Sequence, residues 1–310
     1  MDGRTLGERV RLVGPWLRAR HAGPVRKIGL DAGLGCPHRP PGQSQGGCTF
    51  CPPSAAGRGQ TGQSLATQIA RGLAALERHA ARRGQAPPAA LAYYQAHTST
   101  HAPAATVARL LAPALAEPRV AGLVVSTRPD CLDAARLDVL ARAAAAKPLW
   151  LELGLQSAHD ATLARVGRGH TVAAFDQAVA AAQAHGLDVV AHVILGLPGE
   201  GREEVWATAR HLAELGVWGV KLHGLMVLEG AALAQEWREG RFTPWTLEEF
   251  VAAAAGFLAL LPRQTLIHRL TADPGPDRLL APAWLAGKDQ TLTELAVYLA
   301  AHQMEQGSWL

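Results

Sequence analysis

Short apolar runs alternate with longer alanine-rich segments over residues 27–228 of the chain. The runs have the length of buried strands, and the segments between them have the apolar spacing of helices. Strands are therefore expected near Lys27–Asp31, Leu91–His97, Gly122–Ser126, Leu149–Leu155, Asp188–Leu195 and Gly219–Val227. Helices are expected near Ser64–Arg83, Ala104–Ala116, Ala134–Ala145, Val172–His185 and Glu203–Leu215. Parallel strands joined by helical crossovers form an open doubly wound sheet or a curved barrel, and the pattern does not separate the two.

The alternation changes after about residue 228. Residues 230–242 and 246–261 predict two helices, residues 264–270 a short strand and residues 291–306 a closing helix. No flexible linker precedes this part, so we expect it to pack on the preceding fold. The predicted division is an N-terminal segment, 1–26, an α/β domain, 27–228, and an α-rich C-terminal extension, 229–310.

Composition indicates a folded protein, with 48% hydrophobic and 18% charged residues. The opening residues, MDGRTLGERVRLVG, contain no long apolar run, so they predict neither a secretory signal nor a membrane span. We therefore expect a cytoplasmic protein without membrane contact. A net charge of +4 and a pI near 9.1, carried mainly by arginine, favour a phosphate-bearing partner such as a nucleic acid. Biased genomic base composition would explain the same arginine content.

Three of the four cysteines lie in the stretch CPHRPPGQSQGGCTFC, as Cys36, Cys48 and Cys51. In a reducing compartment such cysteines are thiols or metal ligands, not disulfides. A structural zinc site needs a fourth protein ligand. The available side chains, none in a recognisable zinc spacing, are His38, His97, His101 and Cys131. An iron–sulfur cluster normally takes four cysteines, so three would leave one iron open to another ligand.

This loop resembles the cluster loop of the radical S-adenosylmethionine (SAM) enzymes. In that family three cysteines hold a [4Fe-4S] cluster, and the amino and carboxylate groups of SAM chelate the remaining iron. The usual spacing places three residues between the first two cysteines, whereas this chain has eleven and keeps Cys-x-aromatic-Cys with Phe50. The wider loop is typical of the bacterial YhcC-like branch, which is related to the catalytic subunit of Elongator. Further blocks resemble that branch in the same order: YYQAHTSTHAP, STRPDCL, WLELGLQSAHDATLARVGRGHT, HVILGLPGE, GVKLH and IHRLTAD.

The resemblance implies an α/β fold, a partial (β/α)6 barrel of the TIM type followed by the C-terminal extension. It also implies a [4Fe-4S] cluster and SAM as cofactors, reductive cleavage of SAM to a 5′-deoxyadenosyl radical, and an electron donor such as flavodoxin or ferredoxin. Members of the branch are linked to conversion of the carboxymethylaminomethyl group on the tRNA wobble uridine toward the aminomethyl form. The alternatives are radical chemistry on a small metabolite or protein side chain, and an iron- or redox-sensing metal-binding protein.

The same resemblance assigns cluster binding to Cys36, Cys48 and Cys51. Gln95 and Thr98, at the end of the second strand, would meet the SAM amino group or make ordinary loop hydrogen bonds. Strand alternation places Glu152 and Gln156 on one face, opposite the intervening leucines.

With Ser157, Glu152 and Gln156 would contact the SAM ribose or methionine, or form a hydrogen-bond network inside the barrel. Arg168 is a candidate for the SAM carboxylate or else a solvated surface arginine.

HVILGLPGE resembles the GxIxGxxxE block of the superfamily, with Ile194, Gly196 and Glu200 matching and His192 in place of the first glycine. Gly196 would allow close approach to adenine, and Glu200 is a candidate cap of the following helix. The later pairs have open roles: Lys221 and His223 face substrate or fill the barrel, and His268 and Arg269 have no assigned task. Cys131 is expected to be a small buried residue and not a ligand.

Overall fold

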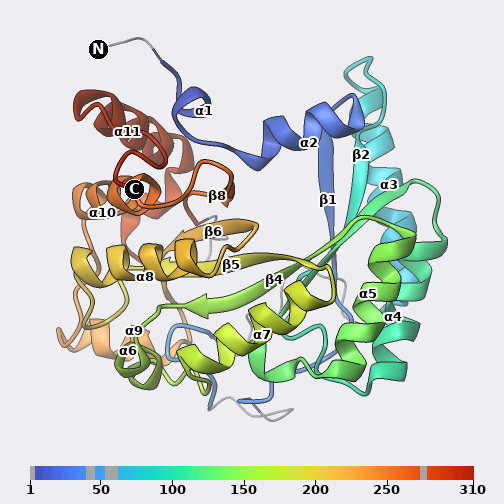
Figure 1. Ribbon diagram of the computed structural model, residues 1–310, viewed down its shortest axis with the longest axis horizontal. Helices are drawn as coiled ribbons and strands as arrows, with labels where there is room; N and C mark the ends of the chain where they lie inside the picture. Colours follow the sequence, from blue (N-terminus) through green and yellow to red (C-terminus); the bar gives the residue numbers. More distant parts are fainter. Residues whose placement is uncertain (1–3, 40–45, 53–61, 273–277) are drawn as a thin grey trace.

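Seven parallel strands form one curved sheet in the computed structural model, which describes residues 4–39, 46–52, 62–272 and 278–310 (Figure 1). The strands follow one another across the sheet in chain order: β1 Val25–Leu30, β2 Ala89–Tyr94, β3 Val120–Thr127, β4 Leu149–Gln156, β5 Asp188–Leu195, β6 Gly219–Gly224 and β8 Leu266–Arg269. A doubly wound sheet would reverse this order at a switch point. The unbroken order curls the sheet in one direction, which confirms the predicted partial barrel.

Helices cover the outer side of the sheet, and Figure 1 shows α3, α4, α5 and α7 along it. Their bounds are α3 Leu65–Ala81, α4 Ala104–Ala116, α5 Ala134–Ala146, α6 Asp160–Arg165, α7 Val172–Ala184 and α8 Arg202–Glu214. Ser64, Asp133 and Thr171 start three of them, because each side chain accepts a hydrogen bond from a first-turn N–H group. The strand side chains that point outward pack with these helices in the main hydrophobic core.

An apolar layer fills the interior at the amino-terminal ends of the strands. Leu91, Val124, Trp150 and Val190 pack there from four neighbouring strands. Helix α2, Val13–His21, closes this end by packing Leu17, and with it Trp16, against the layer. It contacts both edge strands, β1 and β8, and the preceding Leu12 pairs with Ile267 of β8. Helix α2 therefore covers the bottom of the partial barrel, while the short helix α1, Leu6–Arg9, packs on α11, Lys288–Ala301.

The C-terminal region contributes to the main sheet as well as covering it. The strand predicted at 264–270 is β8, which pairs in parallel with β6 as the seventh strand. The strand predicted to reach Val227 ends at Gly224, and β7, Val227–Leu228, pairs instead with β9, Leu279–Ala281. The helices of this region are α9 Ala232–Arg238, α10 Leu247–Ala259 and α11 Lys288–Ala301, and the 3₁₀ turn η2, Ala283–Ala286, precedes α11. Another 3₁₀ turn, η1 Pro129–Cys131, follows β3.

No helix within the described residue ranges is long and apolar enough to cross a membrane.

The ring of His268 lies in the apolar layer at the amino-terminal ends of the strands. Its ring centroid is 5.7 Å from that of Trp150 and 5.2 Å from that of Trp218. Both ring nitrogens are buried and have no hydrogen-bond partner among the described residues. Burial, with a further contribution from the positive charge of Lys27, holds the pKa of His268 well below its usual value. The folded protein therefore keeps this ring neutral.

We predict that His268→Phe makes stability less sensitive to acid. An unfolded histidine takes up a proton near pH 6.5, whereas folded His268 does not, so the unfolded chain binds more protons as the pH falls below that value. Between pH 7 and pH 5 this costs wild type about 2 kcal/mol, which the variant should not lose. Urea unfolding at both pH values measures the difference. The exposed His79 provides the control, since His79→Gln should keep the wild-type slope, and a variant as acid-sensitive as wild type would contradict the assignment.

Candidate active site

A cavity of about 310 Å³ opens where the strands end at their carboxyl side, a size typical of small-molecule sites. It brings together most of the residues predicted from the sequence. Those that line it are Cys36, Cys48, Cys51, Gln95, Thr98, Glu152, Gln156 and Arg168. Ser157 and Gly196 are not among its lining residues.

A polar layer forms the floor of the cavity, directly above the apolar layer. Each of the strands β1 to β6 contributes one residue, and Glu152 is hydrogen-bonded to all the others. Five of them line the cavity, whereas Lys27 of the edge strand β1 is partly exposed and is not among the lining residues. The set, which we call the floor cluster, is Lys27, Tyr93, Ser126, Glu152, His192 and Lys221.

Glu152 is the centre of the floor cluster and its side chain is fully buried. Lys27 Nζ donates to Oε1 at 2.9 Å, and Lys221 Nζ donates to Oε2 at 2.8 Å. The Tyr93 hydroxyl also donates to Oε2, at 2.6 Å, and accepts a hydrogen bond from Lys221 Nζ at 2.7 Å. The carboxylate is thus saturated by protein groups, so the network that the sequence left open as an alternative is present.

The electrostatics of the floor cluster keep Glu152 ionised. Burial alone would raise its pKa, but the positive charges of Lys221 and Lys27 hold it well below the usual value. Burial lowers the pKa of Lys221 to about 8, although Glu152 opposes that shift. Burial and Lys221 together lower the pKa of His192 to about 4, so this ring is neutral near pH 7. Two lysines therefore share one carboxylate.

The alternation predicted for β4 is confirmed. Glu152, Gly154 and Gln156 line the cavity, while Leu151, Leu153 and Leu155 belong to the outer core. A Cβ at Gly154 would collide with the ends of the Arg168 and Gln156 side chains, so these would have to move away. Contact of Gln95, Thr98, Glu152 and Gln156 with SAM stays a prediction.

The cysteine loop is held against the cavity by backbone bonds to two distant elements. Thr49 N donates to Val166 O at 2.9 Å, just after α6, and Leu233 N of α9 donates to Thr49 O at 2.9 Å. Two arginine side chains contact sulfur atoms of the loop. Arg39 Nη1 lies 3.9 Å from Cys51 Sγ, and Arg168 Nη1 lies 3.8 Å from Cys48 Sγ.

The donor set of this loop fits an iron–sulfur cluster. Among the described residues, no group of three His, Cys, Asp or Glu side chains is arranged to hold a metal ion. A single zinc ion needs all its ligands within about 2.0–2.3 Å of one point, whereas each cysteine of a four-iron cluster binds a different iron. Three soft thiols that face one cavity match the second requirement. Burial and the neighbouring Cys48 raise the pKa of Cys51, while Arg39 opposes them, so metal binding would displace a proton from this thiol.

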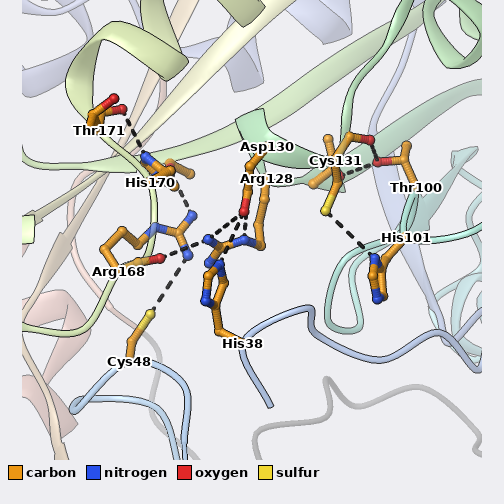
Figure 2. Close-up of polar contacts among 12 residues, drawn as sticks. His38, Cys48, Thr100, His101, Arg128, Asp130, Cys131, Arg168, His170 and Thr171 are labelled. Atoms are coloured by element: carbon orange, nitrogen blue, oxygen red, sulfur yellow. Dashed lines mark hydrogen bonds and ion pairs between the residues drawn. The ribbon is translucent and has the colours of Figure 1, made fainter. Parts of the chain in front are cut away.

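Figure 2 shows a chain of charged groups that leads away from Cys48. Arg128, at the end of β3, donates to Asp130 Oδ1 at 2.8 Å and to the backbone oxygen of Arg168 at 2.7 Å. Asp130 in turn contacts His38 of the cysteine loop at 3.2 Å. The STRPDCL block therefore joins the cysteine loop to the loop that carries Arg168.

Arg168 itself is only 7% exposed, so the alternative of a solvated surface arginine is wrong. Besides contacting Cys48, it donates to Gly154 O at 2.7 Å, and His170 Nε2 lies 3.1 Å from the same oxygen. Burial and the nearby Arg168 lower the pKa of His170 to about 4. A role of Arg168 toward the SAM carboxylate stays a prediction.

The structure brings Ser157 and Glu200 together, away from the cavity. The Ser157 hydroxyl donates to Glu200. Burial raises the pKa of Glu200, and the hydrogen bond from Ser157 offsets only part of that rise. Glu200 does not cap α8, contrary to the sequence expectation. Glu204 does so, because its carboxylate accepts the Gly201 N–H at 2.8 Å.

Gly196 lies against an indole ring. It has a φ of +85°, and a Cβ there would stand 3.2 Å from Trp245 Cδ2. The positive φ favours glycine at this position, and a Cβ would also be in tight contact with the indole ring.

Sequence reasoning missed Lys27, Tyr93, Ser126 and Arg128 as site residues. The first three share a signal with Glu152, because each is a polar residue near the middle or the end of an otherwise apolar strand. The expected lone thiol Cys131 is buried, and its Sγ lies 3.9 Å from His101 Nδ1.

Family models and known proteins match this chain along nearly its whole length. The family model described as the radical SAM superfamily matches residues 33–212, and the radical SAM C-terminal domain matches residues 217–300. Protein YhcC of Escherichia coli is 37% identical over 97% of this chain and 95% of its own length. YtqA of Bacillus subtilis is 31% identical over 94% of this chain and 90% of its own length.

Two more distant relatives match this chain over only part of their own length. A tRNA uridine(34) acetyltransferase of Dehalococcoides mccartyi is 34% identical over 51% of this chain and 34% of its own length. The solved structure of archaeal Methanocaldococcus infernus Elp3 shares the fold, with a TM-score of 0.66 at 15% identity over 91% of this chain and 64% of that one.

We predict that Glu152→Gln strongly destabilises the protein. The substitution leaves Lys27 and Lys221 without their shared counter-ion, and breaking a buried ion pair from one side costs about 3–5 kcal/mol. Ser126→Ala is the matched control, because it removes only one hydrogen bond to the same carboxylate, worth about 1 kcal/mol. Urea unfolding at pH 7 measures both. A Glu152→Gln variant no less stable than Ser126→Ala would show that the floor cluster does not hold the sheet.

Proposed function

Because the chain belongs to the radical SAM superfamily, we propose that Cys36, Cys48 and Cys51 hold a [4Fe-4S] cluster with which this enzyme cleaves SAM to a 5′-deoxyadenosyl radical. The observation that carries the proposal is the convergence of the three thiols on the cavity that also contains the other polar residues expected around SAM. When bound, the cluster supplies the single electron for reductive cleavage of the sulfonium.

The chain's own residues support this chemistry in two ways. Arg39 and Arg168 direct N–H groups at two cysteine sulfurs, and such donors stabilise the extra negative charge of a reduced cluster. Gln95 and Thr98 place polar groups at the end of β2 for the amino group of SAM, and the side chains of the floor cluster are tied to one another through Glu152. Such fixed surroundings direct a reactive radical toward one hydrogen of the substrate.

For the substrate we propose tRNA, with conversion of the carboxymethylaminomethyl group of the wobble uridine toward the aminomethyl form. The C–N bond to the carboxymethyl group breaks and that group leaves as glyoxylate, with one water consumed. SAM is the two-electron oxidant, because its conversion to methionine and 5′-deoxyadenosine takes up the hydrogen atom and the electron that the substrate loses. Support comes from the similarity to the tRNA uridine(34) acetyltransferase and to Elongator complex protein 3 of Homo sapiens, each over about half of this chain. The net charge of +4 agrees with an RNA partner. The cavity has the size for a single base, or equally for a small metabolite, which is the competing substrate class.

We expect the anaerobically reconstituted and reduced protein to form 5′-deoxyadenosine from SAM. Replacing Cys36, Cys48 or Cys51 by alanine should abolish the product and lower the bound iron and sulfide, because each thiol holds one iron. Cys131→Ala is the matched control and should keep both, since this thiol does not line the cavity. Absence of 5′-deoxyadenosine from protein with a verified cluster would contradict the enzyme proposal and favour an iron or redox sensor.

We also expect a strain that lacks the gene to accumulate carboxymethylaminomethyluridine in its tRNA and to lose the aminomethyl-derived nucleosides. Mass spectrometry of digested tRNA measures this, with the wild-type gene restoring the profile and a Cys48→Ala gene failing to do so. An unchanged wobble-uridine profile would rule out the tRNA substrate while leaving the cleavage of SAM untouched.

A further inference from the structure

The cavity has an excess of positive charge on the side formed by β6 and β8. In the floor cluster, Lys27 and Lys221 share the single carboxylate of Glu152. Arg269, the last residue of β8, lines the same cavity and makes no hydrogen bond or ion pair with any residue that the structure describes. His223 Nε2 is buried and also has no hydrogen-bond partner in the described part of the chain. Arg269 and His223 therefore present polar groups that no described residue satisfies.

Three groups, Lys221, His223 and Arg269, belong to one wall of the cavity, which we call the β6–β8 wall. Lys221 and Arg269 are paired in register on the neighbouring strands β6 and β8. His223 follows Lys221 by two residues, so it faces the same side of β6. Burial, and the charges of Arg269 and Lys221, keep the pKa of His223 well below its usual value, so the ring is a neutral hydrogen-bonding group.

The other arginines of the cavity already have partners. Arg128 pairs with Asp130, and Arg39 and Arg168 contact the cysteine sulfurs and backbone oxygens. Arg269 is therefore the guanidinium group in this cavity that has no partner among the described residues. A half-buried cation without a counter-ion is costly unless an anion reaches it, and the planar fork of a guanidinium group matches the two oxygens of a carboxylate or phosphate.

We infer that the β6–β8 wall binds an oxyanion of the substrate, with Arg269 holding it and Lys221 and His223 completing the site. The inference deepens the proposed function, on which the choice of nucleoside below rests. The carboxymethylaminomethyl group ends in a carboxylate, and the aminomethyl product lacks it. The wall would therefore hold the substrate and release the product. SAM also carries a carboxylate, so the experiment has to separate these two sources.

The first experiment compares wild type, Arg269→Gln and Arg210→Gln after cluster reconstitution. Arg210 is exposed on α8 and provides the matched control. Calorimetry measures the dissociation constants of S-adenosylhomocysteine and, with that compound bound, of 5-carboxymethylaminomethyluridine and 5-aminomethyluridine. Arg269→Gln should weaken the carboxylate-bearing nucleoside about tenfold and leave the other two ligands unchanged. Equal weakening of S-adenosylhomocysteine would assign Arg269 to SAM and overturn the inference.

The second experiment needs no assumption about the substrate scaffold. Phenylglyoxal modifies accessible arginines, and peptide mass spectrometry follows the rate at Arg269 and Arg210 with S-adenosylhomocysteine bound. At equal ionic strength, acetate or inorganic phosphate in place of chloride should slow modification several-fold at Arg269 and not at Arg210. Protection by acetate alone identifies a carboxylate, and protection by phosphate alone a phosphate group.

Modification at Arg269 that neither anion slows would overturn the inference. Protection by an anion, together with an unchanged wobble-uridine profile in the deletion strain, would refute the proposed tRNA substrate and leave the oxyanion site in place.

Discussion

The buried carboxylate of Glu152 is the point at which six strands of the sheet are joined by side chains. Backbone pairing alone holds each strand to its neighbours, and it leaves the curvature of a partial barrel free to open. Hydrogen bonds from β1, β2, β3, β5 and β6 to one group on β4 fix that curvature from inside. The carboxylate can stay charged in this position only because Lys27 and Lys221 reach it.

The alternation of β4 then generates the site layer by layer. Trp150 belongs to the apolar layer and Glu152 to the floor cluster, while Gly154 and Gln156 line the cavity above them. The small residue at the third level is what leaves room for a ligand, since a side chain at Gly154 would displace Arg168 from its contacts with the backbone and with Cys48. The packing of the apolar layer and the width of the cavity are thus consequences of one strand pattern.

The elements themselves could be predicted from sequence because apolar periodicity is a local property. Strand β5 begins and ends where the pattern placed it, at Asp188 and Leu195. The arrangement of the elements depends on contacts between distant residues. The strand at 264–270 was expected, but its pairing with β6 was not. Strand β8 pairs with the edge of β6 that β5 does not occupy, and Leu12 pairs in turn with Ile267 of β8. The floor cluster was equally invisible, because a lone lysine in VRKIGL and a lone glutamate in LWLELGLQ show no relation until the strands are in register. Glu200 and Glu204 illustrate the limit at helix ends, where four residues decide which carboxylate caps and which is buried.

Two sets of positive groups in the cavity have different surroundings, and this separation has a mechanistic meaning. Arg39 and Arg168 contact the cysteine sulfurs, so their charge is available to a cluster that gains an electron. Arg269 and Lys221 stand on β8 and β6, and among the described residues that line the cavity the one carboxylate is that of Glu152 on β4, which the floor cluster already shares. If a single set of arginines served both tasks, an anionic substrate would neutralise the charges that favour reduction of the cluster. With separate sets, binding an oxyanion at the β6–β8 wall leaves the cationic neighbours of the cysteines in place, so substrate binding and electron transfer do not oppose each other.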